Sequence, residues 1–217
     1  MGTMIKLSET RKLDGIKSWS LEALATCPGS VGAGGKLVPA CQGCYATQGA
    51  YRWPQVKAPR IHNREDWKRS DFVLDFVRSL KGQKYFRWFD SGDAYALGLA
   101  EKMLEIMRAT PETKHWFPTR MAKFSKFSKV LADMEALPNV KVRFSSDSIL
   151  GEFTPGLHGS TILHDEVTPP GVIKCMAYAN GGKCSGCRAC YSKSIQVIGY
   201  PAHGAYAKRV IKIALAA

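Results

Sequence analysis

Apolar side chains recur with helical spacing in three stretches of the chain. Residues 65–80, 97–109 and 122–136 each carry them three or four positions apart, which predicts three helices. Short runs of aromatic and β-branched residues predict strands at 85–90, 114–118, 140–144, 161–163 and 195–200. Residues 18–27 indicate an approach strand or a turn. Because helices alternate with strands, we expect an α/β fold in which βα units build a mostly parallel sheet.

Three predicted strands end in small, polar or charged residues. In parallel sheets, ligands bind in the loops that follow the carboxyl ends of the strands. This rule selects Gly92 and Asp93 after the first clear strand, Thr119 and Arg120 after the second, and Ser145, Ser146 and Asp147 after the third. Polar turns and helix caps are the alternative, because Ser and Asp also favour helix starts. We predict cofactor-binding roles for Gly92, Asp93, Thr119, Arg120 and Ser145 and assign no catalytic residue.

The chain divides into three parts. The first 18 residues are polar, which predicts a loosely held N-terminal arm. Residues 19–170 form the predicted core with the first cysteine loop, and residues 171–217 form a cysteine-rich C-terminal segment. Between Cys27 and Cys41, four glycines and two prolines predict a loop, because glycine supplies positive φ and proline interrupts hydrogen-bond ladders.

Seven cysteines fall into two groups. The C-terminal group has the spacing Cys-x8-Cys-x2-Cys-x2-Cys, which is dense for ordinary packing and typical of iron–sulfur clusters; zinc is the alternative metal. Three cysteines in the N-terminal group leave one metal position without a protein ligand, and an open position permits chemistry. We predict that all seven bind metal: Cys27, Cys41 and Cys44, and Cys175, Cys184, Cys187 and Cys190.

Composition and charge limit the expected cellular location and partners of the protein. No run approaches the roughly 20 apolar residues that span a bilayer, and the first ten residues lack the apolar stretch of a secretory signal. We therefore expect a cytoplasmic protein without a membrane partner, in which thiols bind metal instead of pairing as disulfides. The formal net charge of +13 favours an anionic partner such as a nucleic acid or nucleotide. Solubility is the alternative, because Lys and Arg are spread along the chain.

Two further residues are candidates for a site. The five histidines lack metal-ligand spacing with one another, and His203, which follows a predicted strand, is the first to test. Trp53 could stack on a base, with core packing as the default for it and the other aromatic residues.

The strand ends and cysteines together resemble a known family. The resemblance is to the phage gene product 88 family and, more distantly, to the radical S-adenosylmethionine (SAM) superfamily. It runs from about Trp19 to His203 and covers most of the chain. The residues that carry it are Cys27, Cys41, Cys44, Tyr45, Ala46, the segment from Asp90 to Asp93, Thr119, Arg120, the second cysteine group, and Pro201 to His203.

The resemblance to the radical SAM superfamily implies a cofactor arrangement and a partial (β/α) barrel. The trio of Cys27, Cys41 and Cys44 would bind a [4Fe-4S] cluster that chelates SAM, with Gly92 and Asp93 holding the SAM amino group. The other four cysteines would bind an auxiliary cluster. The chain differs from the superfamily in the thirteen-residue gap after Cys27 and in the glycine just before Cys44. These differences bear on SAM binding more than on cluster binding.

Three functions fit these expectations. The first is a radical SAM-type enzyme that uses an external electron donor and acts on a nucleotide or nucleic acid, in the host cytoplasm if phage-encoded. The second is a non-catalytic iron–sulfur or zinc protein that binds nucleic acid or a host partner. An electron carrier is the third, and it is disfavoured because most of the chain is devoted to a sheet with polar strand ends.

Overall fold

A computed structural model describes residues 5–165 and 167–216. The strands within these residues form one eight-stranded sheet of order β1-β2-β3-β4-β5-β6-β8-β7. Every pairing is parallel except that of β1 with β2, so the mostly parallel α/β sheet is confirmed, and the barrel form stays a prediction. The strands are β1 (Ser8–Glu9), β2 (Lys17–Trp19), β3 (Tyr85–Trp88), β4 (Lys114–Thr119), β5 (Val140–Ser145), β6 (Gly159–Leu163), β7 (Val172–Lys174) and β8 (Val197–Pro201).

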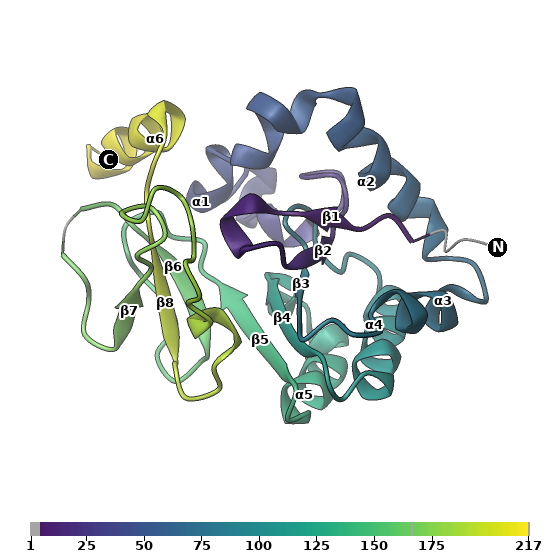
Figure 1. The fold of residues 1–217 in the computed structure, drawn as a ribbon. Helices are drawn as coiled ribbons and strands as arrows, with labels where there is room; N and C mark the ends of the chain where they lie inside the picture. The colour runs from purple at the N-terminus through teal and green to yellow at the C-terminus, as the bar shows by residue number, and fades with distance from the viewer. Residues whose placement is uncertain (1–4, 166, 217) are drawn as a thin grey trace.

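Six α-helices accompany the sheet in the described part of the chain (Figure 1). None of them is long and apolar enough to cross a membrane. They are α1 (Pro39–Gln42), α2 (Pro54–Asp66), α3 (Phe72–Ser79), α4 (Leu97–Ala109), α5 (Ser128–Ala136) and α6 (Ala205–Leu215).

Helix α4 has the predicted bounds, whereas two other helix predictions are wrong in extent. The helix predicted over 65–80 is two helices, because the polar turn 67–71 separates α2 from α3. The helix predicted over 122–136 begins only at Ser128, after two short 3₁₀ turns. Helix α2 escaped the hydrophobic pattern because the residues that it buries are polar: Arg60, Asn63 and Asp66.

One face of the sheet packs against α3, α4 and α5 (Figure 1). Trp19 of β2 lies at the centre of this core and makes edge contacts with Phe72, Phe76 and Trp88 at ring-centroid distances of 5.7, 6.0 and 6.2 Å. Aromatic pairs of this geometry stabilise a core beyond their buried area. The alternating side chains of β3, β4 and β5 therefore leave Tyr85, Trp116 and their neighbours for the opposite face.

That opposite face is covered by the N-terminal segment and the cysteine-rich segment. Trp116 packs there with Leu13 and Ile16, and Cys184 and Cys190 lie against the same cluster. Leu13 and Ile16 are buried, so the prediction of a loosely held arm is wrong for residues 5–18. The two cysteine groups consequently occupy different places: the quartet lies against a sheet face, and the trio lies in the loop after β2.

The turn after β3 takes a sharp path. Phe89 has a φ of +54°, a strained value for a non-glycine residue, and its ring is held between Trp19 and Phe117 at 5.8 and 5.7 Å. Gly92 has a φ of +83°, and a Cβ there would lie 2.6 Å from Leu21 Cβ. Both the conformation and the space therefore require glycine at position 92.

Gly92→Ala should destabilise the protein by more than about 2 kcal/mol, because the new methyl group meets Leu21 and the φ is unfavourable. Gly98→Ala is the matched control: it lies in α4, its Cβ would meet nothing closer than 3.9 Å, and alanine favours helix. Urea unfolding measures both. Equal stability of the two variants would contradict this account of the turn.

A neutral histidine lies in the core. His115 is fully buried; it accepts a hydrogen bond from Trp88 Nε1 at 3.2 Å, and its Nε2 lies 2.9 Å from Thr110 Oγ1. Burial lowers the pKa of His115 to about 4. The unfolded chain therefore binds this proton more readily than the folded chain between about pH 6.5 and 4.

As pH falls through that window, the free energy of unfolding should drop by up to about 3 kcal/mol on account of His115, at about 1.4 kcal/mol per pKa unit. In His115→Gln this contribution is absent. Urea unfolding from pH 7 to 4 measures the difference between wild type and variant, which should shrink as pH falls. A difference that does not change with pH would refute the prediction.

Candidate functional site

The loop that carries the trio of Cys27, Cys41 and Cys44 rests on the carboxyl ends of β4 and β5. A Cβ at Gly29 would lie 2.5 Å from Arg120 Cβ, so the loop backbone touches the residue after β4. Lys123 Nζ donates to the carbonyl of Gly29 at 2.8 Å. The backbone N–H of Ala40 donates to the carbonyl of Asp147, after β5, at 2.9 Å. Both halves of the loop are thereby fixed to strand ends.

Asp90 anchors the chain after the third cysteine of the trio. Its backbone carbonyl accepts a hydrogen bond from Tyr45 Oη at 2.7 Å, and its carboxylate accepts one from Tyr51 Oη. Arg87 and Arg60 pair with the same carboxylate at 3.0 and 3.3 Å. Asp90 therefore ties the Tyr45–Tyr51 segment to the end of β3.

The three thiols of the trio lie near one another. Burial raises the pKa of Cys27 to about 12, and charges on Asp93, Cys44 and Cys41 raise it as well. Burial also raises the pKa values of Cys41 and Cys44, which the Arg120 guanidinium opposes. Cys41 and Cys44 likewise interact with each other. The fold thus gathers the trio that the sequence grouped.

Asp93 is a buried clamp between strand ends. Its carboxylate accepts hydrogen bonds from Thr119 Oγ1 at 2.7 Å and from the backbone N–H groups of Arg120 and Ala94 at 2.8 Å each. Burial raises the pKa of Asp93, and these hydrogen bonds oppose that rise. Both carboxylate oxygens therefore have donors from within the fold.

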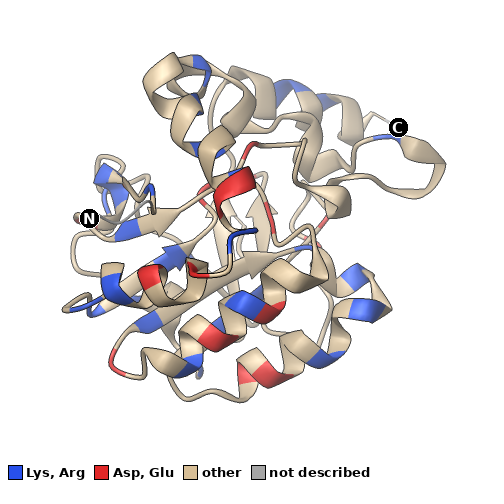
Figure 2. Cartoon of the chain, turned by 90° about the vertical axis from the view of Figure 1, so that its right-hand side faces the viewer, with Lys and Arg blue, Asp and Glu red and all other residues tan. Residues whose placement is uncertain are grey.

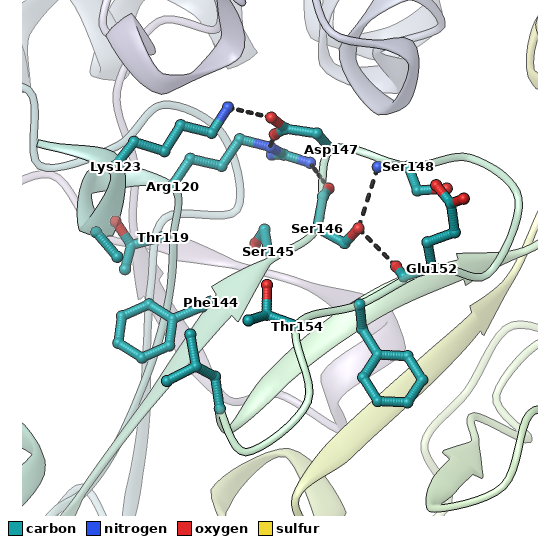
Figure 3. A pocket seen from close by; sticks show the side chains of 13 residues that line it. Thr119, Arg120, Lys123, Phe144, Ser145, Ser146, Asp147, Ser148, Glu152 and Thr154 are labelled. Carbon is teal, nitrogen blue, oxygen red and sulfur yellow. Dashed lines mark hydrogen bonds and ion pairs between the residues drawn. The ribbon is translucent and has the colours of Figure 1, made fainter.

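A cavity of about 450 Å³ opens beside the trio, at the ends of β4 and β5 (Figure 3). Thr119, Arg120 and Ser145 line it, so three of the five predicted cofactor-binding residues share one cavity. Gly92 and Asp93 do not line it: Gly92 packs against Leu21, and Asp93 accepts a hydrogen bond from Thr119. Arg120 donates to Asp147 Oδ1 at 3.3 Å and to the carbonyl of Ser146 at 2.8 Å. The other lining residues are Ala122, Lys123, Phe144, Ser148, Glu152, Phe153, Thr154 and Leu157.

The fold gathers three cysteines of the second group. Burial and the charges of Cys190 and Cys175 raise the pKa of Cys184. Burial raises the pKa of Cys190, against the hydrogen bond between its thiol and Tyr200 Oη at 3.3 Å. Cys187 is exposed, and its backbone N–H donates to the carbonyl of Cys184 at 2.9 Å.

A buried arginine organises the loop after Cys187. Arg143 of β5 is fully buried and donates only to backbone carbonyls. The bonds to Cys190 and Ala189 measure 2.9 and 3.0 Å, and those to Ser192 and Ile195 measure 3.0 and 3.1 Å. Because guanidinium nitrogens present five donors in a fixed plane, one side chain fixes the course of this whole segment.

Unsatisfied donors surround the second cysteine group. Arg87 Nε, Trp116 Nε1 and Tyr191 Oη are buried without a hydrogen-bond partner. Arg87 lies over the Trp116 ring at 4.7 Å, and that ring meets Tyr191 at 5.9 Å. Trp116 and Tyr191 pack with Cys184 and Cys190. Native proteins rarely leave buried donors unpaired, so these three donors are available to a group that accepts hydrogen bonds.

The remaining candidates have other surroundings. No group of three or more Cys, His, Asp and Glu side chains within residues 5–165 and 167–216 is arranged to hold a single metal ion. His203 is exposed and stacks on Tyr178 at 5.3 Å. Trp53 is 56% exposed, so the expectation of core packing is wrong for this residue.

The sequence did not reveal the supporting roles of Asp90, Arg87 and Arg143. Asp90 bonds to Tyr45 and Arg143 to Cys190 across more than forty residues of chain, and Arg87 pairs with Asp90 three residues away. One signal was present: Arg87 interrupts an aromatic strand and Arg143 alternates with apolar residues in another, and charged residues inside such strands must find partners.

Comparison with known proteins yields one match. A family model described as Gene product 88 matches residues 3–166, which include the trio, the turn after β3 and all of the cavity-lining residues. No curated protein and no solved structure matches the chain.

Proposed function

The chain belongs to the gene product 88 family, and we propose that it is an iron–sulfur protein with two clusters, one of them open to a small-molecule cavity. The N-terminal trio would hold the open cluster, and Cys175, Cys184, Cys187 and Cys190 would hold a closed one. The observation that carries this proposal is the set of three unsatisfied donors around the second cysteine group.

Those donors suit a cluster. Cluster sulfides and thiolates accept hydrogen bonds, and such bonds tune the cluster's reduction potential. The positive charge of Arg143 and Arg87 near Cys190 would offset the negative charge of a four-thiolate cluster. Cys187 is exposed on a turn that contains Gly186. Bringing its thiol to the other three would therefore displace little packed chain.

A cluster also agrees with the spacing better than zinc does. Four-cysteine zinc sites usually pair two separated Cys-x2-Cys units, whereas Cys184, Cys187 and Cys190 follow one another at a constant spacing that is typical of iron–sulfur proteins.

The trio would support radical SAM-type chemistry. Cys27, Cys41 and Cys44 would hold a cluster with one position free for SAM, and Thr119, Arg120 and Ser145 would line the space for the ligand. Such a cluster would supply one electron, taken from an external donor, for cleavage of SAM to methionine and a 5'-deoxyadenosyl radical, which would take a hydrogen atom from the substrate and leave a substrate radical. Arg120 would face the SAM carboxylate. Glu152, a cavity carboxylate without an ion pair in the described chain, would face its amino group.

A second candidate is a non-catalytic iron–sulfur protein that binds nucleic acid. The observation that favours it is the clamp at Asp93, because this buried carboxylate already accepts three hydrogen bonds from within the fold, at least one on each oxygen, and serves to join strand ends. The two candidates share the clusters and differ in whether SAM is cleaved.

Anaerobically purified Cys44→Ser and Cys187→Ser should each lose about half of the wild-type absorbance near 400 nm, because each removes a ligand of a different cluster. After reduction with SAM present, wild type and Cys187→Ser should yield 5'-deoxyadenosine, and Cys44→Ser should yield none.

Wild-type absorbance near 400 nm without any 5'-deoxyadenosine would select the non-catalytic candidate. Absorbance unchanged in both variants would rule out clusters at these cysteines. Cys187 is exposed and Cys44 is partly so, which makes both serine variants compatible with folding; thermal unfolding of each provides the check.

A further inference from the structure

The excess positive charge is confined to the two cysteine-bearing segments. Residues 23–64 contain five Lys and Arg and no acidic residue, and residues 167–217 contain seven and none. The rest of the chain carries nineteen Lys and Arg against eighteen Asp and Glu, so it is almost neutral. The even spread of cations noted in the sequence therefore conceals a strongly uneven distribution of acids.

The neutral part shows the contrast. On α3 and α5, cations pair with acids, as Arg78 does with Asp75 at 3.4 Å and Lys129 with Asp133 at 2.8 Å. Blue and red alternate along the lower helices in Figure 2. Such pairing is typical of a solvated surface, and it needs no anionic partner.

The two acid-free segments meet beside the trio. Helix α6 packs against α1, and Tyr206 lies 3.2 Å from the position that a Cβ of Gly43 would take. Gly43 stands between Cys41 and Cys44. Arg52 and Lys57 follow this contact in one segment, and Lys208 and Arg209 follow it in the other; all four are exposed and have no ion-pair partner among the described residues.

Exposed aromatic rings accompany these cations. Trp53 is 56% exposed, Tyr45 52% and Tyr206 46%. Tyr45 and Tyr51 hold the segment before Trp53 to Asp90, so Trp53 projects from an anchored backbone. Cations interleaved with aromatic rings on a fixed surface are the features that bind single-stranded nucleic acids, because phosphates pair with the cations and bases stack on the rings.

We propose that this surface binds single-stranded nucleic acid across the opening of the trio, with a base stacked on Trp53 and phosphates on Arg52, Lys57, Lys208 and Arg209. The proposal names the substrate class for the site described above, and it rests on the proposed function only for the chemistry that follows binding. The negative charge of two clusters is too small to explain the excess of Lys and Arg in the two acid-free segments. Two clusters with seven thiolates contribute about −3, against twelve Lys and Arg in two segments that contain no acidic residue.

Fluorescence anisotropy of a labelled 15-nucleotide strand, as DNA and as RNA, tests binding between 50 and 200 mM salt. Trp53→Ala should weaken binding about 5- to 100-fold through lost stacking. The double variants Arg52→Gln/Lys57→Gln and Lys208→Gln/Arg209→Gln should each flatten the slope of log affinity against log salt by about 1.4.

The matched control is Lys84→Gln/Lys114→Gln. It removes the same charge from two exposed residues at the opposite, amino end of β3 and β4, and it should change affinity less than about 2-fold. Inorganic polyphosphate, which has charge without bases, should compete poorly and should not distinguish Trp53→Ala from wild type. Equal weakening by the control pair, or no effect of Trp53→Ala, would overturn the proposal.

Iron content and 5'-deoxyadenosine formation are measured on the same preparations. If a protein without iron binds the nucleic acid through Trp53, the binding surface is supported and the proposed function is refuted. If the protein holds clusters and cleaves SAM but does not bind nucleic acid, the proposed function is supported and the binding surface is refuted. If only the DNA or only the RNA binds, that result identifies the strand chemistry that the surface accepts.

Discussion

The position of the trio depends on two buried carboxylates in the turn after β3. Asp93 joins the ends of β3 and β4 through Thr119 and the backbone of Arg120. Asp90 holds the segment after Cys44 through two tyrosine hydroxyls. A loop rich in glycine has a high conformational entropy in the unfolded chain, so it takes a single path only if such contacts offset that cost.

The sheet separates two chemical environments. Its helix-covered face is apolar and aromatic, whereas its other face presents Arg87 and Arg143 toward Cys190. Buried cations are costly unless paired, and here carbonyl groups, one carboxylate and thiols surround them. The acid-free segments add exposed cations around the open edge. The proposed cluster of the trio, the cavity and the proposed nucleic-acid surface would therefore lie next to one another.

The parts of the fold that the sequence predicted are those with local signals. Helix α4 and strands β3 to β5 have strong apolar periodicity, and their predicted positions agree with the structure. Helix α2 buries polar residues, and β1 and β7 are edge strands of two and three residues, too short to show a pattern of their own. In the site, the strand-end rule found Thr119, Arg120 and Ser145. It could not find Arg143, whose role comes from carbonyls that lie about fifty residues along the chain.

The central claim is that the seven cysteines hold two iron–sulfur clusters. The measurement that tests it most directly is the iron, sulfide and zinc content per chain after anaerobic purification. The account predicts about eight irons and about eight sulfides with no stoichiometric zinc. About four irons would leave one cysteine group without a cluster. Stoichiometric zinc without iron or sulfide would contradict the account.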